Sequence, residues 1–178
     1  FKDVARADWY YDAVTFLAAR SITKGTSADA FNPAGPTTRG QFVVMLMRTY
    51  GIDPDASSSD HFADAGDAYY TDYLAAAKRL GIATGVGHNR FDPNSAITRE
   101  EMITLLYRAL AVIGELPTNG GGTKLSDFRD ASALSAFAQE AAEKLADSGI
   151  ISGSGGMLHP QRTATRAEMA QVFYHLLS

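Results

Sequence analysis

The chain contains no cysteine among its 178 residues. Disulfides, thiolate metal sites and cysteine nucleophiles are therefore excluded. This absence does not fix the compartment, although a surface protein without a disulfide system would have such a composition. Long apolar runs are missing as well, and no stretch of about 18 apolar residues could cross a membrane as a helix. We therefore expect no membrane partner.

An excess of basic residues is also missing. The chain carries 16 basic and 20 acidic residues, which gives a net charge of −4. A general nucleic-acid binder needs a basic stripe that contacts phosphates, so this balance argues against that class. Composition indicates a mildly acidic globular module. It opens directly on a repeat unit without a signal peptide, so we expect it to be part of something longer.

The common catalytic and metal-binding motifs are absent too. The sequence has no Gly-x-Ser-x-Gly, no P-loop and no dinucleotide-binding fingerprint. Asp53-Pro54-Asp55 lacks the glycine and the terminal glutamate of a calcium-binding loop. No histidine has paired spacing or a carboxylate partner pattern; the four are His61, His88, His159 and His175. We expect no enzyme activity, no cofactor and no metal ion.

What the chain does have is one short string in three copies. A Thr-Arg pair follows each time seven residues after an apolar residue that opens an apolar-x-Pro triplet. The copies are Thr38-Arg39-Gly40-Gln41, Thr98-Arg99-Glu100-Glu101 and Thr165-Arg166-Ala167-Glu168. A period of about 60 to 70 residues indicates one supersecondary unit used three times. An isolated unit of that size is marginally stable, so we expect the three to share a core.

The repeats predict a domain organisation. We place them at residues 1–52, 60–115 and 125–178, with turn-rich linkers at 53–59 and 116–124, together forming one compact unit. Each repeat begins with Phe-x-Asp and an aromatic residue, followed by a stretch with helical spacing. That helix should end at Gly81 and Gly149, where a left-handed cap favours glycine, and less firmly at Ser21.

The repeated threonine predicts the start of a second helix in each unit. A Gln or Glu three positions on completes the spacing of a capping box, which explains both residues structurally. The apolar stripes of these helices can bury themselves against each other.

The arginine in the string is not needed for capping. A positive charge in the first helical turn opposes the helix dipole, so Arg39, Arg99 and Arg166 suggest another use. A guanidinium beside free backbone N–H groups makes a carboxylate receptor. The alternative is a salt bridge to an Asp of a neighbouring copy, and the two roles can hold at different copies.

Other repeated residues allow two interpretations. Asp3, Asp64 and Asp130 can cap a helix or shape a turn, or they can accept hydrogen bonds from sugar hydroxyls. Trp9, Tyr70 and Phe137 can be core or groove wall, or platforms on which a sugar stacks. Gly25, Gly85 and Gly153 serve turns, yet a backbone without side chains also lets a ligand approach closely.

Taken together, Phe-x-Asp, Gly-Ile-x-x-Gly, Phe-x-Pro and Thr-Arg-x-Glu resemble the S-layer homology domain in three tandem copies. The resemblance covers nearly the whole chain outside the linkers. It implies an all-α, pseudo-threefold prism of helix-loop-helix repeats around a central three-helix bundle, with grooves between copies. The first copy departs from the pattern at Gln41, and the third lacks the Phe of Phe-x-Pro.

The resemblance also implies a function. Such modules anchor secreted bacterial surface proteins non-covalently to a secondary cell wall polysaccharide, often one that carries ketal-linked pyruvate on N-acetylmannosamine. We expect a monomeric anchor in the cell wall or S-layer. The ligand-binding residues expected from both lines of reasoning are Arg39, Arg99, Arg166, Asp3, Asp64, Trp9, Tyr70, Gly25 and Gly85. The alternative function is a protein–protein or self-assembly module of a surface lattice.

Overall fold

The computed structural model describes residues 1–118 and 120–178. Within those ranges the chain forms six α-helices, three short 3-10 helices and no β-strand. The α-helices are α1 (Tyr11–Ala19), α2 (Arg39–Thr49), α3 (Thr71–Arg79), α4 (Arg99–Ile113), α5 (Gln139–Asp147) and α6 (Arg166–Leu177). The 3-10 helices are η1 (Leu125–Asp127), η2 (Ala131–Ala133) and η3 (Ala136–Ala138). The predicted all-α fold class is confirmed.

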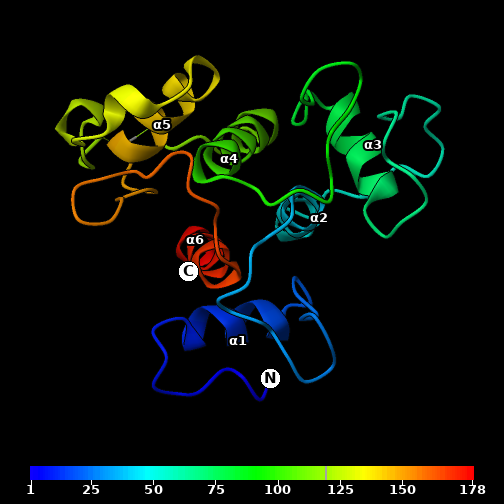
Figure 1. Ribbon diagram of the computed structural model, residues 1–178, viewed down its shortest axis with the longest axis horizontal. Helices are drawn as coiled ribbons and strands as arrows, with labels where there is room; N and C mark the ends of the chain where they lie inside the picture. The colour runs from blue at the N-terminus through cyan, green and yellow to red at the C-terminus, as the bar shows by residue number, and fades with distance from the viewer. Residues whose placement is uncertain (119) are drawn as a thin grey trace.

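Three helices surround the centre and three lie outside them (Figure 1). The central helices α2, α4 and α6 are the second helices of the three repeats, and α1, α3 and α5 are the first. Each outer helix packs on a central helix from another repeat: α3 on α2, α5 on α4, and α1 on α6. The first and last helices of the chain therefore close the ring, and no repeat forms its lobe alone.

A cyclic set of backbone hydrogen bonds joins the three repeats just before the central helices. The N–H of Thr37 donates to the carbonyl of Ala164, Ala164 donates to Ile97, and Ile97 donates to Thr37, over 2.8 to 3.1 Å. All three residues are fully buried. Deeper in the core the rings of Phe42 and Phe173 stack, with centroids 5.5 Å apart. These contacts form the shared core that we expected because a single repeat is too small to be stable alone.

The capping boxes form as predicted in the first two repeats. The hydroxyls of Thr38 and Thr98 accept from the third backbone N–H, and the side chains of Gln41 and Glu101 bond back. The third threonine accepts from the N–H of Glu168. The Glu168 carboxylate instead contacts two arginines. Its Oε2 pairs with Arg99 of the second repeat, and its Oε1 pairs with Arg162 of the same repeat.

The outer helices end where glycine was expected to end them. Gly81 and Gly149 adopt φ of 77° and 82° directly after the caps of α3 and α5. Ser21 takes the same left-handed conformation after α1, with φ of 57°. A residue with a Cβ is strained there, so this cap is the weakest of the three.

The linkers connect the lobes. The first predicted linker, 53–59, includes Asp55, whose carboxylate lies 3.2 Å from Arg79. The second, 116–124, contains residue 119, which lies outside the described residues. The repeat and linker boundaries remain a prediction.

Candidate functional site

Two grooves with equivalent positions lie between the repeats. The first, the Arg39 groove, has a volume of about 580 Å³, and the second, the Arg166 groove, has about 460 Å³. The Arg39 groove is lined by Arg39, Thr84, Gly85, Val86, Phe91, Asp92, Ser95, Ala96, Thr98, Glu100, Glu101, Thr104, Leu105, Arg108 and Phe137. The Arg166 groove is lined by Ile22, Thr23, Lys24, Gly25, Thr26, Gln41, Val44, Met45, Arg48, Tyr69 and Arg166.

Each groove draws on all three repeats. Arg39 comes from the first repeat, Gly85 from the second and Phe137 from the third. In the Arg166 groove the arginine comes from the third repeat, Gly25 from the first and Tyr69 from the second. Neither groove exists in a single repeat, because the ring must close before its walls meet.

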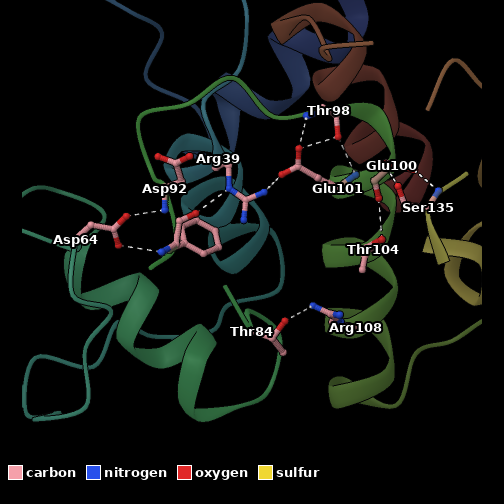
Figure 2. Close-up of polar contacts among 11 residues, drawn as sticks. Arg39, Asp64, Thr84, Asp92, Thr98, Glu100, Glu101, Thr104, Arg108 and Ser135 are labelled. Atoms are coloured by element: carbon pink, nitrogen blue, oxygen red, sulfur yellow. Dashed lines mark hydrogen bonds and ion pairs between the residues drawn. The ribbon is translucent and has the colours of Figure 1, made fainter. Parts of the chain in front are cut away.

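The repeated arginines hold neighbouring repeats together. Arg39 Nε donates to the carbonyl of Phe91 over 2.8 Å, and Arg39 also forms an ion pair with Glu101 (Figure 2). Arg99 makes the same two contacts at the interface between the second and third repeats. Its Nε donates to the carbonyl of Leu158 over 2.8 Å and its Nη1 to Glu168 over 2.6 Å. Both arginines therefore form a salt bridge to a neighbouring copy, which the sequence left open as an alternative, but the partner is a Glu rather than the expected Asp.

Arg166 keeps only half of this arrangement. Its Nε donates to the carbonyl of Phe31 over 2.6 Å, and its guanidinium lies 4.6 Å from the centre of the Phe31 ring. The residue that corresponds to Glu101 and Glu168 is Gln41, which has no charge. Among the described residues, no carboxylate forms an ion pair with Arg166.

Burial makes these charges expensive to leave unpaired. Arg39 and Arg166 are 7% and 4% exposed. Desolvation lowers the pKa of both guanidinium groups below the ordinary value. Nearby acidic groups act against this shift: the carboxylates of Asp92 and Asp64 at Arg39, and the Tyr69 phenol and the Asp3 carboxylate at Arg166. Each groove therefore presents a cation that water solvates poorly.

Exposed aromatic rings stand beside the grooves. Phe137 and Tyr69 are 53% and 59% exposed and line the Arg39 and Arg166 grooves. Trp9, 63% exposed, precedes α1 as these two precede α5 and α3, so symmetry places it beside the interface of Arg99. Tyr70, the sequence's candidate, is only 8% exposed and packs edge-on under Tyr69. The sequence shows a Tyr69-Tyr70 pair without indicating which ring faces out.

The aspartates of Phe-x-Asp are not among the lining residues of the two grooves and instead hold loops. Asp64 accepts from the N–H groups of Phe91 and Asp92, both over 2.8 Å (Figure 2). Asp3 accepts from Phe31 and Asn32 over 2.8 and 2.7 Å, and Asp130 makes the same pair of bonds in the third repeat. The bond from Phe31 lowers the pKa of Asp3. Burial raises the pKa of Asp64, but its two backbone bonds outweigh that effect and leave the pKa lowered.

The repeated glycines allow close packing at the groove wall. Gly85 adopts φ of 84°, and a Cβ there would come within 2.5 Å of the Arg90 carbonyl oxygen and 2.9 Å of the Phe62 ring. Gly25 is equally crowded, by the Ala30 carbonyl and the Phe1 ring. Close packing therefore explains why both positions are glycine without involving a ligand. The same two residues also line the grooves.

Sequence reasoning missed two basic residues of the grooves. Arg48 lines the Arg166 groove, and Arg108 lines the Arg39 groove, where it donates to Thr84 over 3.1 Å (Figure 2). Each lies nine positions after the arginine of its Thr-Arg pair, on the same helix. His175 occupies this position in α6. The repeated spacing was visible in the sequence and would have identified them.

The described part of the chain shows neither a metal centre nor a membrane span. Within it, no group of three acidic or histidine side chains is placed to hold a metal ion. None of the helices found there is long and apolar enough to cross a membrane.

Comparison with known proteins identifies the family. The model of the S-layer homology domain matches residues 1–43, 61–103 and 127–170. The S-layer protein sap of Bacillus anthracis is 32% identical over 171 residues, covering 96% of this chain and 20% of that protein. An endoglucanase of Bacillus sp. strain KSM-635 is 35% identical over 182 residues, covering 99% of this chain and 18% of that protein.

The chain therefore spans about a fifth of the length of these curated relatives. Among solved structures, an undecaheme cytochrome from the S-layer of Carboxydothermus ferrireducens is similar at 19% identity and a TM-score of 0.44, covering 80% of this chain and 17% of that one. That likeness is too weak to add to the assignment. With its three matched segments, the chain belongs to the S-layer homology family and is a cell-wall anchoring module of the bacterial surface.

Proposed function

We propose that this module anchors its parent protein by binding an anionic secondary cell wall polysaccharide in the grooves between repeats. The charged determinant is a carboxylate, such as that of ketal-linked pyruvate on N-acetylmannosamine. The observation that carries the proposal is the buried arginine that lines each groove. A carboxylate that reaches such a guanidinium forms charge-assisted hydrogen bonds in a poorly solvated site, where they contribute most.

Groove size and wall chemistry support a sugar ligand. Volumes of about 580 and 460 Å³ fall within the range of small-molecule sites, about 300–1,000 Å³. Phe137 and Tyr69 offer exposed ring faces, and Tyr69 adds a hydroxyl. Gly85 and Gly25 line the two grooves with backbone alone, which lets a sugar approach closely.

Repetition of the groove supports a polymeric ligand. A polysaccharide that occupies two grooves gains avidity because the second binding event is intramolecular. The contacts within one groove then need only modest affinity. With a net charge of −4, the protein exerts little long-range attraction on an anionic polymer, so recognition depends on the local arginines.

The rival function, a protein–protein or lattice contact, has less support. A large contiguous apolar patch would mark a protein interaction site. The exposed rings Trp9, Tyr69 and Phe137 belong to three different interfaces around the ring. Distribution of this kind favours repeated small sites over one large one.

Catalysis in the parent protein, if it has any, is proposed to lie outside these 178 residues. The relative named as an endoglucanase matches this chain over 18% of its own length. The remaining length leaves room for separate domains, and the module would then hold them at the cell wall.

Co-sedimentation with purified Gram-positive cell walls tests the proposal. Walls are used before and after mild acid removal of ketal pyruvate, with an unrelated acidic protein as the control. We expect binding to intact walls and its loss after pyruvate removal. Binding that survives the acid step would contradict the carboxylate determinant, and absence of binding to either wall would support the protein–protein alternative.

A further inference from the structure

The interface around Arg166 lacks the carboxylate that the other two interfaces contain. Glu101 pairs with Arg39, and Glu168 pairs with Arg99. In the Arg166 groove the corresponding position is occupied by Gln41. Arg166 is 4% exposed, and within the described residues no carboxylate forms an ion pair with it, although Asp3 acts on its charge. A buried guanidinium without an ion-pair partner favours an anion from outside.

The bonding of Gln41 explains why it cannot replace the glutamate. Its Oε1 accepts from the N–H of Thr38 over 3.0 Å, as Glu101 Oε1 accepts from Thr98. The other terminal atom of Glu101 pairs with Arg39. In Gln41 that other atom is an amide nitrogen, which only donates and has nothing to offer a guanidinium.

The rest of the Arg166 groove is positive as well. Its charged lining residues are Arg166, Arg48 and Lys24, and no acidic residue lines it. In the Arg39 groove two cations share the lining with Asp92, Glu100 and Glu101. The two grooves have equivalent positions in the fold but opposite balances of charge among their lining residues.

We propose that the Arg166 groove selects the anionic group of the ligand, whose carboxylate takes the place that a glutamate holds beside Arg39 and Arg99. This inference rests on the proposed function and specifies it: one groove binds the charged group of the ligand. Arg48 and Lys24 lie in the same groove and attract the same group. The Arg39 groove, whose arginine already has its carboxylate, contacts uncharged parts of the glycan.

The substitution Gln41→Glu tests this directly. It supplies the missing carboxylate while keeping the capping box, which Glu101 forms in the same way in the second repeat. Calorimetric titration would use the methyl glycoside of N-acetylmannosamine with and without ketal pyruvate. We expect the variant to remain folded and to lose the preference for the pyruvylated glycoside by about 10- to 150-fold, the value of one charged hydrogen bond.

Two further variants serve as controls. Gln139→Glu changes the net charge equally at an exposed position in the first turn of α5, outside both grooves, and should leave the preference unchanged. The double substitution Lys24→Ala and Arg48→Ala removes two positive charges from the groove, and neither residue is buried. It should weaken binding of the pyruvylated glycoside and leave binding of the uncharged glycoside unchanged.

The outcomes distinguish failure of the assignment to the Arg166 groove from failure of the proposed function. A wild-type protein that discriminates between the glycosides, with a Gln41→Glu variant that discriminates equally well, would overturn the assignment to the Arg166 groove and leave the proposed function intact. A wild-type protein that shows no preference for the pyruvylated glycoside would overturn the proposed function, and this inference with it.

Discussion

Single residues in this chain depart from their two counterparts, and each departure has an energetic consequence. Ser21 holds the left-handed position that glycine holds at Gly81 and Gly149. Ser21 is exposed, so a substitution there changes little besides backbone strain. Ser21→Gly should raise the free energy of unfolding by about 1 kcal/mol, the cost of a left-handed residue with a Cβ. Urea unfolding measures it, and Gly81→Ser should produce the opposite shift.

Thr37 is the second such residue. It lies in the cyclic hydrogen bonds at the centre, where the counterparts are Ile97 and Ala164. Its hydroxyl is buried with no hydrogen-bond partner. Thr37→Val keeps the shape and removes the unsatisfied group, so we expect a gain of about 1 kcal/mol in unfolding free energy. A loss of stability in thermal denaturation would show that the hydroxyl contributes something the hydrogen bonds do not reveal.

At the scale of elements, one carboxylate holds each loop that carries apolar-x-Pro. The bonds from backbone N–H groups lower the pKa of Asp3, and they outweigh burial at Asp64 and Asp130, whose pKa values are lowered too. A carboxyl with a lowered pKa in the folded state stabilises above its unfolded pKa, near 3.9, and this contribution is lost as the pH falls through the folded value.

Unfolding free energy should therefore be nearly constant around neutral pH and decrease below about pH 4. Asp64→Asn removes one titrating group, so its unfolding free energy should be lower near neutral pH and change less with acid. Urea unfolding at a series of pH values measures this. An Asn variant with the same acid dependence as the wild type would show that the loop carboxylates do not control it.

The elements themselves were largely predictable, because their signals are local. Threonine with Gln or Glu three positions on marked the central helices, and glycine or serine marked the ends of the outer helices. The third capping box was an exception, since Glu168 pairs with Arg99, which is far away in sequence, and with Arg162. Tyr69 and Tyr70 also escaped local reasoning, because packing against other segments decides which of two adjacent rings is exposed.

At the scale of the whole molecule, the ring depends on pairing between repeats. Its closure by α1 on α6 joins the two ends of the chain, where Phe16 and Tyr174 pack edge to face with centroids 5.1 Å apart. Which repeat each outer helix packs against is a non-local property that the spacing of motifs does not encode. For the same reason, sequence reasoning found the arginines but not the residues they meet.

A fragment limited to residues 1–115 should therefore neither fold fully nor bind the cell wall. It lacks α6, on which α1 packs, and α5, which packs on α4. Both grooves lose a wall, since Phe137 and Arg166 are absent. We expect reduced helix content by circular dichroism and no sedimentation with cell walls. A well-folded fragment that binds walls would contradict the closed ring as the functional unit.

Competition on the native cell wall tests the central claim most directly. Wall-bound protein is titrated with the N-acetylmannosamine glycoside that carries ketal pyruvate and, in parallel, with the same glycoside without it. Groove binding of the charged sugar predicts that the pyruvylated glycoside releases the protein and that the uncharged one leaves it in place. Equal release by both, or by neither, would contradict recognition of a carboxylate in the grooves between repeats.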